Sequence, residues 1–388
     1  MMATVATGIA AGFAACTGDD TPPAVFPDAG SDVVVVDTGT DVSTPDAAPL
    51  ENAKVIVVHA SPDVPAVRVC FGIGTKADGS DAILSPLPPL PDVRSSSGQP
   101  YPGVFPGFGA QMPDVKVDLS PVAVTPFVVF ASAVKDVERI DGGTADGGAL
   151  AGCSKLIGGD AASLVAGVDY LKLPTIPQGT LAKGTTLLLA MTGCLPIATD
   201  PNATAAKCGS DYNGGTGNVT AKLFVLDRKL GDPAKLGTRV IHASQPLDGV
   251  NTAAGSIGLV ASLTTVFDGG SGSQTIVAAG DGFKFGEQKP TASLGVTFPV
   301  AAADGTFSIA GALADGGTVS AASFPLTNVH ALSTGASTGA DAYFGKGHNV
   351  AFVVVGDPSQ SLVTDAGTNG TALHVLAFPT DPPTIPYP

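Results

Sequence analysis

The chain has 388 residues, of which 44% are hydrophobic and only 14% are charged, and its formal net charge is −15. This length allows two or three domains, each large enough to bury a core. Residues 1–53 contain eight acidic residues and no Lys or Arg, so about half of the net charge belongs to that segment. The remainder has no basic run that could displace counterions from phosphates, and we expect no nucleic-acid partner.

The sequence pattern indicates strands joined by turns. The chain contains 50 Gly and 32 Pro, which interrupt it too often for long helices. Short runs of Val, Thr, Phe and Ile alternate with clusters of Gly, Pro and Asp, as strands alternate with turns. We therefore predict an all-β fold.

The N-terminal residues 2–15 are small and apolar and end at Phe13-Ala14-Ala15-Cys16. This segment resembles the lipobox of bacterial lipoprotein signal peptides, whose Cys becomes the acylated N-terminus after cleavage. The resemblance implies a signal peptide over 1–16, lipidation of Cys16, and a membrane-anchored protein of the bacterial cell envelope, on the outer membrane or the cell surface. The alternative is a hydrophobic N-terminal strand that contains a Cys by chance.

Residues 17–53 are rich in Asp, Pro, Thr, Gly and Ala, and we predict an acidic, disordered linker here. Within it, Asp37-Thr38-Gly39 is similar to the D-T-G of aspartic proteases. Those enzymes need two carboxylates that share a proton, and the chain has no second D-T-G or D-S-G. We assign this motif no catalytic role.

Three sequence signatures occur twice and in the same order. The V-H-A-S stretch returns as I-H-A-S, and two further strand-like runs have counterparts near the C-terminus; the matched ranges are 58–61 with 241–244, 183–189 with 346–352, and 223–226 with 373–376. The spacing shrinks in the second copy, as loop deletions would produce. We predict two modules, at 54–234 and 235–388. Both opening strands are apolar on both faces, which is typical of an inner strand.

The run V-H-A-S-P-D-V-P-A-V-R-V at 58–69 is similar to the opening of an uncharacterised repeat family of bacterial surface proteins, whose repeats begin V-R-V-V-H-A-S-P-D-A-P. The resemblance implies two tandem antiparallel β-sandwiches of the immunoglobulin-like kind, a surface location, and no catalytic residues. In the second copy only His242, Ala243 and Ser244 match, because Gln245-Pro246-Leu247-Asp248 replaces the continuation.

Four cysteines remain in a chain that we expect to be exported: Cys70, Cys153, Cys194 and Cys208. An even number in such a chain suggests two disulfides. Cys194 and Cys208 bracket a turn-rich segment between two strand-like runs, so a local bridge there is plausible and would leave Cys70 to pair with Cys153. Zinc is the competing interpretation, but no C-x-x-C or paired His lies near any Cys.

His59, Ser61 and Asp63 have the residue types of a catalytic triad. On a strand, residues two apart stand about 6–7 Å apart, too far for the hydrogen bonds of a relay. Pro62 also ends the strand, and the second copy has no Asp in register. We expect instead a structural role, with a buried His at the strand end and Ser61 and Asp63 shaping the turn; His242 and Ser244 are the counterparts.

The strongest enzymatic pattern is Gly335-Ala336-Ser337-Thr338-Gly339, which fits the G-x-S-x-G of serine hydrolases. Asp357 or Asp365 and then His374 follow in the order that such enzymes use. A nucleophile elbow needs a helix after the Ser, and the glycines that follow do not favour one. A serine hydrolase using Ser337 is therefore the alternative function.

Other patterns indicate turns rather than ligand sites. Gly214-Gly215-Thr216-Gly217 lacks the Lys of a phosphate loop, and the Asp-Gly clusters at 141–147, 268–270 and 315–317 lack the spacing of a calcium loop, although calcium-dependent adhesion stays open. We predict no cofactor and no metal. The favoured function is a non-catalytic surface module that contacts a protein or glycan partner through end loops, including the insertion at 72–113.

Overall fold

The computed structural model divides the chain into two units, residues 1–48 and 49–388, and all described residues belong to the second. Cys16 and Asp37 lie outside the described residues. The described ranges are 52–75, 81–83, 103–111, 118–137, 152–157, 164–197, 203–228, 232–233, 235–253, 255–267, 270–290, 296–298, 305–315, 318–335, 338–364 and 367–380.

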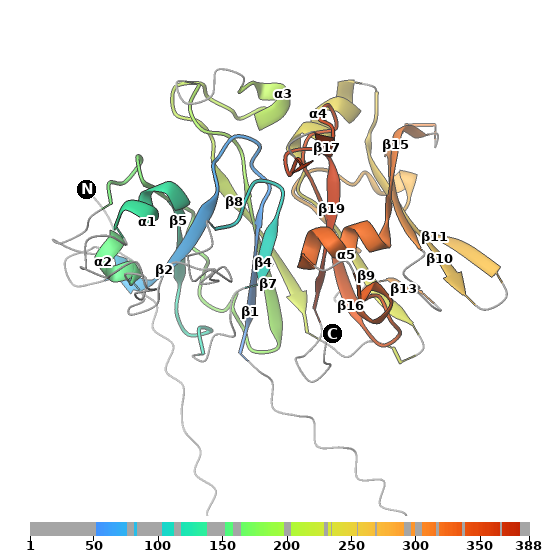
Figure 1. Ribbon diagram of the computed structural model, residues 1–388, viewed down its shortest axis with the longest axis horizontal. Coiled ribbons are helices and arrows are strands. Elements are labelled where there is room, and N and C mark those ends of the chain that lie inside the picture. Colours follow the sequence, from blue (N-terminus) through green and yellow to red (C-terminus); the bar gives the residue numbers. More distant parts are fainter. Residues whose placement is uncertain are drawn as a thin grey trace, which may run out of the picture. The chain divides into compact units, whose positions relative to one another are not determined.

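Two sheets are formed by the first half of the described chain (Figure 1). We call them inner sheet 1, in the order β4-β1-β7-β8, and outer sheet 1, in the order β3-β2-β5-β6. Their strands are β1 (Lys54–His59), β2 (Val67–Thr75), β3 (Asp81–Ile83), β4 (Gly109–Gln111), β5 (Val124–Phe130), β6 (Tyr170–Lys172), β7 (Thr185–Thr192) and β8 (Thr220–Asp227).

The second half forms inner sheet 2, in the order β12-β9-β16-β19 with β13 also paired to β9, and outer sheet 2, in the order β11-β10-β14-β15. A separate two-stranded sheet pairs β17 with β18. The strands are β9 (Leu236–His242), β10 (Gly258–Phe267), β11 (Gly270–Val277), β12 (Gln288–Lys289), β13 (Val296–Phe298), β14 (Thr306–Ala312), β15 (Thr318–Pro325), β16 (Asn349–Val355), β17 (Val363–Thr364), β18 (Gly367–Thr368) and β19 (His374–Pro379).

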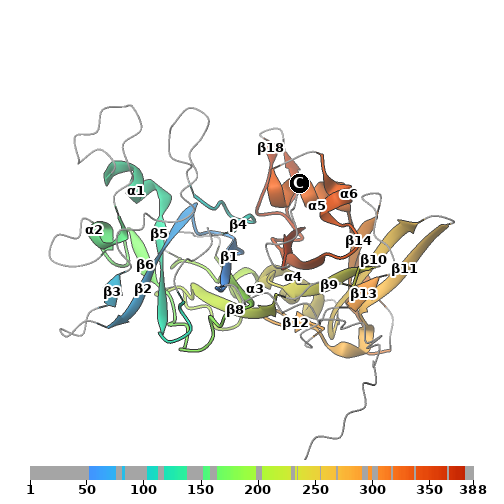
Figure 2. The ribbon, with the colours of Figure 1, turned by 90° about the horizontal axis from the view of Figure 1, so that it is seen from below.

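Short helices connect the strands, and Figure 2 shows several of them at the sheet ends. They are α1 (Ala131–Val137), α2 (Cys153–Ile157), α3 (Ala205–Cys208), α4 (Gln245–Ala253), the 3₁₀ turn η1 (Ala279–Asp281), α5 (Leu326–Thr334) and α6 (Ala340–Tyr343). No described helix is long and apolar enough to cross a membrane.

The inner sheets are covered on both faces, which explains why their strands are apolar on both faces. On β1, Val55 and Val57 pack toward outer sheet 1, whereas Ile56 and Val58 pack toward inner sheet 2. Successive side chains of a strand point to opposite faces, so one apolar run serves two cores. Inner sheet 2 is likewise covered by outer sheet 2 on its other face.

The contact between the two inner sheets, which we call the inter-sheet core, joins the halves of the described chain. From the first half it buries Leu188 and Phe224, and from the second half Ile241, Val353 and Leu376, each at most 3% exposed. These side chains are as deeply buried as those within each half. The halves therefore share one hydrophobic cluster, which lies beside the separate cluster that each half forms between its own inner and outer sheets.

The prediction of an all-β sandwich fold is confirmed, and the structure adds one feature to it. Among the described strand pairs, all are antiparallel except β1 with β7 and β9 with β16, which are parallel. A parallel pair needs a long crossover between its strands. In each half, the chain that includes the outer-sheet strands lies between the two parallel partners, which are β1 and β7 in the first half and β9 and β16 in the second.

The four cysteines form two disulfides, in the pairing that the sequence favoured. Cys70 of β2 is bonded to Cys153 of α2, and Cys194 after β7 is bonded to Cys208 at the end of α3. All four are at most 2% exposed. The second bond closes a local loop above one end of inner sheet 1.

Candidate functional site

His59, Ser61 and Asp63 hold loops together at the end of β1. Ser61 Oγ donates to the carbonyl of Gly193 at 2.7 Å, and an Asp63 carboxylate oxygen accepts the N–H of Leu195 at 2.9 Å. The imidazole Nε2 of His59 lies 3.0 Å from the carbonyl of Pro65. Burial lowers the pKa of His59 to about 4, so the ring is neutral near pH 7. The Ser61 hydroxyl also lies 3.2 Å from an Asp63 carboxylate oxygen, closer than strand spacing predicts, because the chain turns after β1. Among the described residues no hydrogen bond joins this hydroxyl to the imidazole, which faces the carbonyl of Pro65, so the three do not have the geometry of a nucleophile and its base.

His242 and Ser244 occupy the corresponding position after β9. Ser244 Oγ donates to the carbonyl of Gly356, the counterpart of the Ser61 contact. The His242 ring is fully buried against Phe283 and Phe285, and its two nitrogens have no hydrogen-bond partner among the described residues. Burial lowers the pKa of His242 to about 3. Its Nε2 lies 3.9 Å from a carboxylate oxygen of Asp248, a residue that lines the cavity described below.

The residues of the alternative hydrolase do not form a described triad. Ser337 and Asp365 lie outside the described residues, and Asp357 accepts the backbone N–H and the hydroxyl of Ser359. His374 is buried, and its two nitrogens lie 2.6 Å from the carbonyls of Ala372 and Gly107. The imidazole that would serve as the base therefore contacts backbone carbonyls from both halves of the chain.

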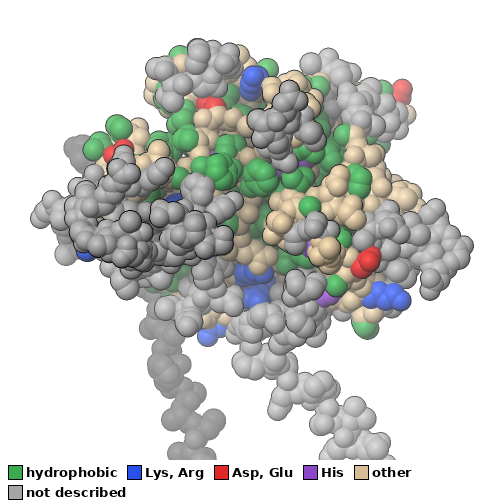
Figure 3. All heavy atoms as spheres, in the orientation of Figure 1, with side chains coloured by type: hydrophobic (Ala, Val, Ile, Leu, Met, Phe, Trp, Pro, Cys, Tyr) green, Lys and Arg blue, Asp and Glu red, His purple; other side chains and the backbone are tan. Residues whose placement is uncertain are grey.

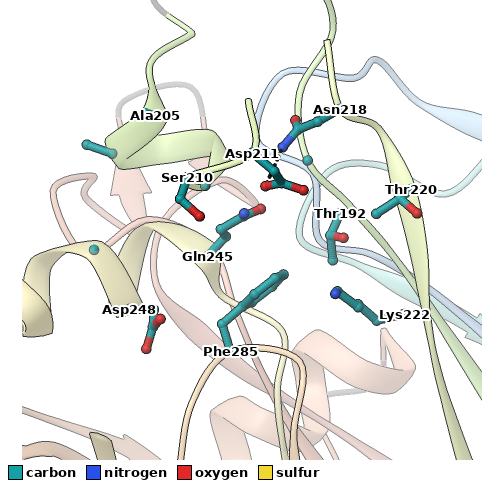
Figure 4. A pocket seen from close by; sticks show the side chains of 14 residues that line it. Thr192, Ala205, Ser210, Asp211, Asn218, Thr220, Lys222, Gln245, Asp248 and Phe285 are labelled. Carbon is teal, nitrogen blue, oxygen red and sulfur yellow. Dashed lines mark hydrogen bonds between the residues drawn. The ribbon is translucent and has the colours of Figure 1, made fainter. Parts of the chain in front are cut away.

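A cavity of about 570 Å³ opens between α3 and α4, which lie side by side in Figures 1 and 2. Figure 4 shows its labelled side chains, which come from both halves of the chain. The lining residues are Thr192, Gly193, Ala205, Ala206, Gly209, Ser210, Asp211, Asn218, Thr220 and Lys222 from the first half, and Gln245, Asp248, Gly249 and Phe285 from the second.

The rim of the cavity is fixed by the Cys194–Cys208 disulfide and by Asn218. The Asn218 side chain accepts the N–H of Cys194 at 2.9 Å and donates to the carbonyl of Cys208 at 2.8 Å. The same amide nitrogen lies 3.2 Å from an Asp211 carboxylate oxygen. The Asn218 side chain thus bonds to the backbone at both cysteines of the disulfide loop, and it also contacts the Asp211 carboxylate beside the cavity.

The two helices can meet closely because Gly249 of α4 lies against α3. A Cβ atom at Gly249 would stand 2.8 Å from the carbonyl oxygen of Ala206, closer than real Cβ atoms approach. A larger residue would push α4 away from α3. The close approach of Gly249 to Ala206 therefore sets how near α4 lies to α3 beside the cavity.

Carboxylates, one ammonium group and uncharged polar side chains surround the cavity. Asp211 is exposed, and Asp248 is half-buried, which raises the pKa of its carboxyl, while the N–H of Phe285 and the charge of Lys284 oppose that rise. Lys222 Nζ lies 5.5 Å from the centre of the Phe285 ring. Elsewhere, the described part of the face in Figure 3 carries mostly apolar and uncharged side chains, with charged ones scattered.

The described lining presents hydrogen-bonding groups and one aromatic ring. Among the described residues, the hydroxyls of Thr192, Ser210 and Thr220 are not hydrogen-bonded to a carboxylate or an imidazole. No group of three His, Cys, Asp or Glu in the described part of the chain is placed to hold a metal ion. The lining therefore offers a ligand hydrogen bonding and packing.

Comparison with known proteins gives no family for this chain: no protein-family model matches it, and no curated protein sequence is significantly similar. Solved structures that resemble it include proposed adhesion proteins of Bacteroides. One from Bacteroides uniformis has 9% identity and a TM-score of 0.21, covering 84% of this chain and 96% of that one. A proposed adhesin from Bacteroides ovatus has 12% identity and a TM-score of 0.19, covering 86% and 97%. Scores this low support no inference about this chain.

Sequence reasoning did not find the cavity. Binding was expected at end loops and in 72–113, of which 76–80, 84–102 and 112–113 lie outside the described residues. The lining residues belong to no motif, and they come from segments far apart in the chain. The one available signal was the Gln245-Pro246-Leu247-Asp248 departure from the repeat signature, because two of its four residues line the cavity.

Replacing both Cys194 and Cys208 with Ser is expected to lower the free energy of unfolding by about 3 kcal/mol, because the bond closes a loop of this size in the unfolded chain. Urea denaturation followed by circular dichroism measures the change. The Cys70→Ser, Cys153→Ser pair is the comparison, and its longer loop should give a larger loss. A smaller loss for that pair would contradict the loop-entropy account.

Proposed function

We propose that this chain is a non-catalytic interaction module of the bacterial cell envelope, made of two tandem copies of one β-sandwich unit and anchored through a lipid on Cys16. The observation that carries the proposal is the preformed polar cavity between α3 and α4, whose described lining has no nucleophile paired with a base. Binding sites of soluble domains are cavities of this size with few convergent polar groups.

The strand connections support the tandem copies. The orders β4-β1-β7-β8 and β3-β2-β5-β6 become β12-β9-β16-β19 and β11-β10-β14-β15 when each strand is replaced by its counterpart in the second half. The backbone contacts repeat as well: Ala60 N–H donates to Met191 and Ala243 N–H to Val354, at 2.8 and 2.9 Å. One unit duplicated in one chain accounts for both correspondences.

The two disulfides support a location outside the cytosol, since such bonds persist in oxidising compartments. Intact-mass analysis of the native protein tests the location and the anchor together. We expect an acylated Cys16 at the N-terminus and four cysteines that do not react with an alkylating reagent. Native protein that retains an unmodified Met1 would overturn the anchor.

The proposal also predicts that the chain does not hydrolyse esters. Protein with Ser337→Ala should behave as the unaltered chain does on a panel of activated esters, with rates at the level of the buffer. A rate above buffer that disappears in the Ser337→Ala variant would replace the proposed function with a serine hydrolase.

A further inference from the structure

We propose that the cavity between α3 and α4 binds an uncharged saccharide, an assignment that rests on the proposed function and names its ligand class. The described lining provides carboxylates at Asp211 and Asp248, an amide at Gln245, hydroxyls, and the Phe285 ring. Carboxylates and amides can each accept hydrogen bonds from neighbouring sugar hydroxyls.

A buried hydroxyl in the cavity wall is the second observation that points to a ligand. Thr192 lines the cavity and is 1% exposed, and its Oγ1 has no hydrogen-bond partner among the described residues. A buried polar atom normally has a partner, because leaving it without one costs free energy. The Oγ1 atom is closed to solvent in this conformation, and a rotation of the Thr192 side chain toward the cavity would let a ligand hydroxyl supply the missing hydrogen bond.

The charges of the lining disfavour an anionic ligand. Two carboxylates face one ammonium, that of Lys222. Asp248 lies in the first turn of α4, where a bound anion would otherwise interact with the helix N-terminus. A phosphate or a carboxylate entering the cavity would be repelled by both acids.

The position of Lys222 disfavours a cationic ligand. Its ammonium lies over the Phe285 ring, which is where a ligand cation would be most favourably placed. A second cation would have to displace Lys222 or remain close to it. A neutral ligand with many hydroxyls avoids repulsion both by the two carboxylates and by Lys222. It can donate hydrogen bonds to the carboxylates and accept one from Lys222.

The divergence of the second copy built this site. In the first copy, Asp63 after the V-H-A-S signature accepts the N–H of Leu195 and serves the fold. In the second copy, Gln245 and Asp248 follow the signature within α4 and line the cavity. The cavity is completed by the disulfide-bound α3 of the first copy, so neither copy contains the site alone.

The test is a titration of the full chain with uncharged sugars: glucose, galactose, mannose, N-acetylglucosamine, lactose and cellobiose. The chain has no Trp, so binding is followed by saturation-transfer NMR and by calorimetry. We expect at least one of these sugars to bind, and glucosamine and glucose 6-phosphate to bind at least ten-fold more weakly than the matching neutral sugar. Tighter binding of either charged sugar, or no binding of any neutral sugar, would overturn the assignment.

Two variants locate the binding. Asp211→Asn keeps the shape of the side chain and removes its charge, and we expect it to weaken binding about ten-fold or more. Asp118→Asn is the matched control, because Asp118 is also an exposed carboxylate but pairs with Lys183 outside the cavity, and binding should stay unchanged. Equal affinity of both variants would place the sugar elsewhere. A lipidated chain that binds none of the sugars would retain the proposed function and lose this assignment.

Discussion

The Leu188→Asp variant is expected to lose about 5 kcal/mol or more of unfolding free energy, enough to leave most of the chain unfolded. Leu188 is fully buried in the inter-sheet core, where the neighbouring side chains are apolar. The change removes a buried aliphatic side chain and introduces a carboxylate without a partner, and each effect alone costs several kcal/mol. Urea denaturation followed by circular dichroism measures the loss.

Val225→Asp is the matched control, because Val225 lies on β8 of the same sheet and is 39% exposed. There the carboxylate keeps its water, and the unfolding free energy should change by about 1 kcal/mol or less. If Leu188→Asp were as stable as Val225→Asp, the two halves would not depend on a shared core. The comparison therefore tests whether the halves fold as one body or as separate domains.

The sequence predicted the inner strands but not what covers them. Ile56 and Val58 on one face of β1, with Val55 and Val57 on the other, already indicate burial on both sides. The pattern cannot say which sheet supplies the second cover, because any apolar face satisfies it. The structure shows that this cover is inner sheet 2. The parallel pairing of β1 with β7 was missed for a similar reason, since strand periodicity carries no direction.

The candidate site was harder to predict than the disulfides. Cys194 and Cys208 are close in sequence and flank a turn-rich segment, so their pairing follows from local reasoning. Thr192 and Phe285 meet at the cavity only because the two inner sheets pack together. The residues Gln245–Asp248, which do not match the sequence that follows V-H-A-S in the first half, were interpreted only as a loss of the signature. In the structure they form the start of α4. A change in a sequence signature is informative where it alters an element at the contact between the two halves.

Buried histidines make the stability of the chain depend on pH. Burial lowers the pKa of His59 to about 4 and that of His242 to about 3, while both would titrate near 6.5 in the unfolded chain. Between these values the unfolded chain binds more protons than the folded chain does. The free energy of unfolding therefore falls as the pH drops below about 6.5. His374, whose pKa burial also lowers, acts in the same direction, and Asp248, whose pKa is raised, opposes it.

Between pH 7 and pH 5, His59 and His242 together are expected to lower the free energy of unfolding by about 4 kcal/mol, or about 2 kcal/mol each. Urea denaturation at pH 7, 6 and 5 measures this change. The His242→Phe variant should lose about half of it, since the ring already packs against Phe283 and Phe285 without a hydrogen-bond partner. Phe285→Leu disturbs the same packing without removing a titrating group and should keep the full dependence. Equal pH dependence in His242→Phe and the unaltered chain would mean that the folded and unfolded chains bind the His242 proton equally, so that burial does not lower the pKa of His242.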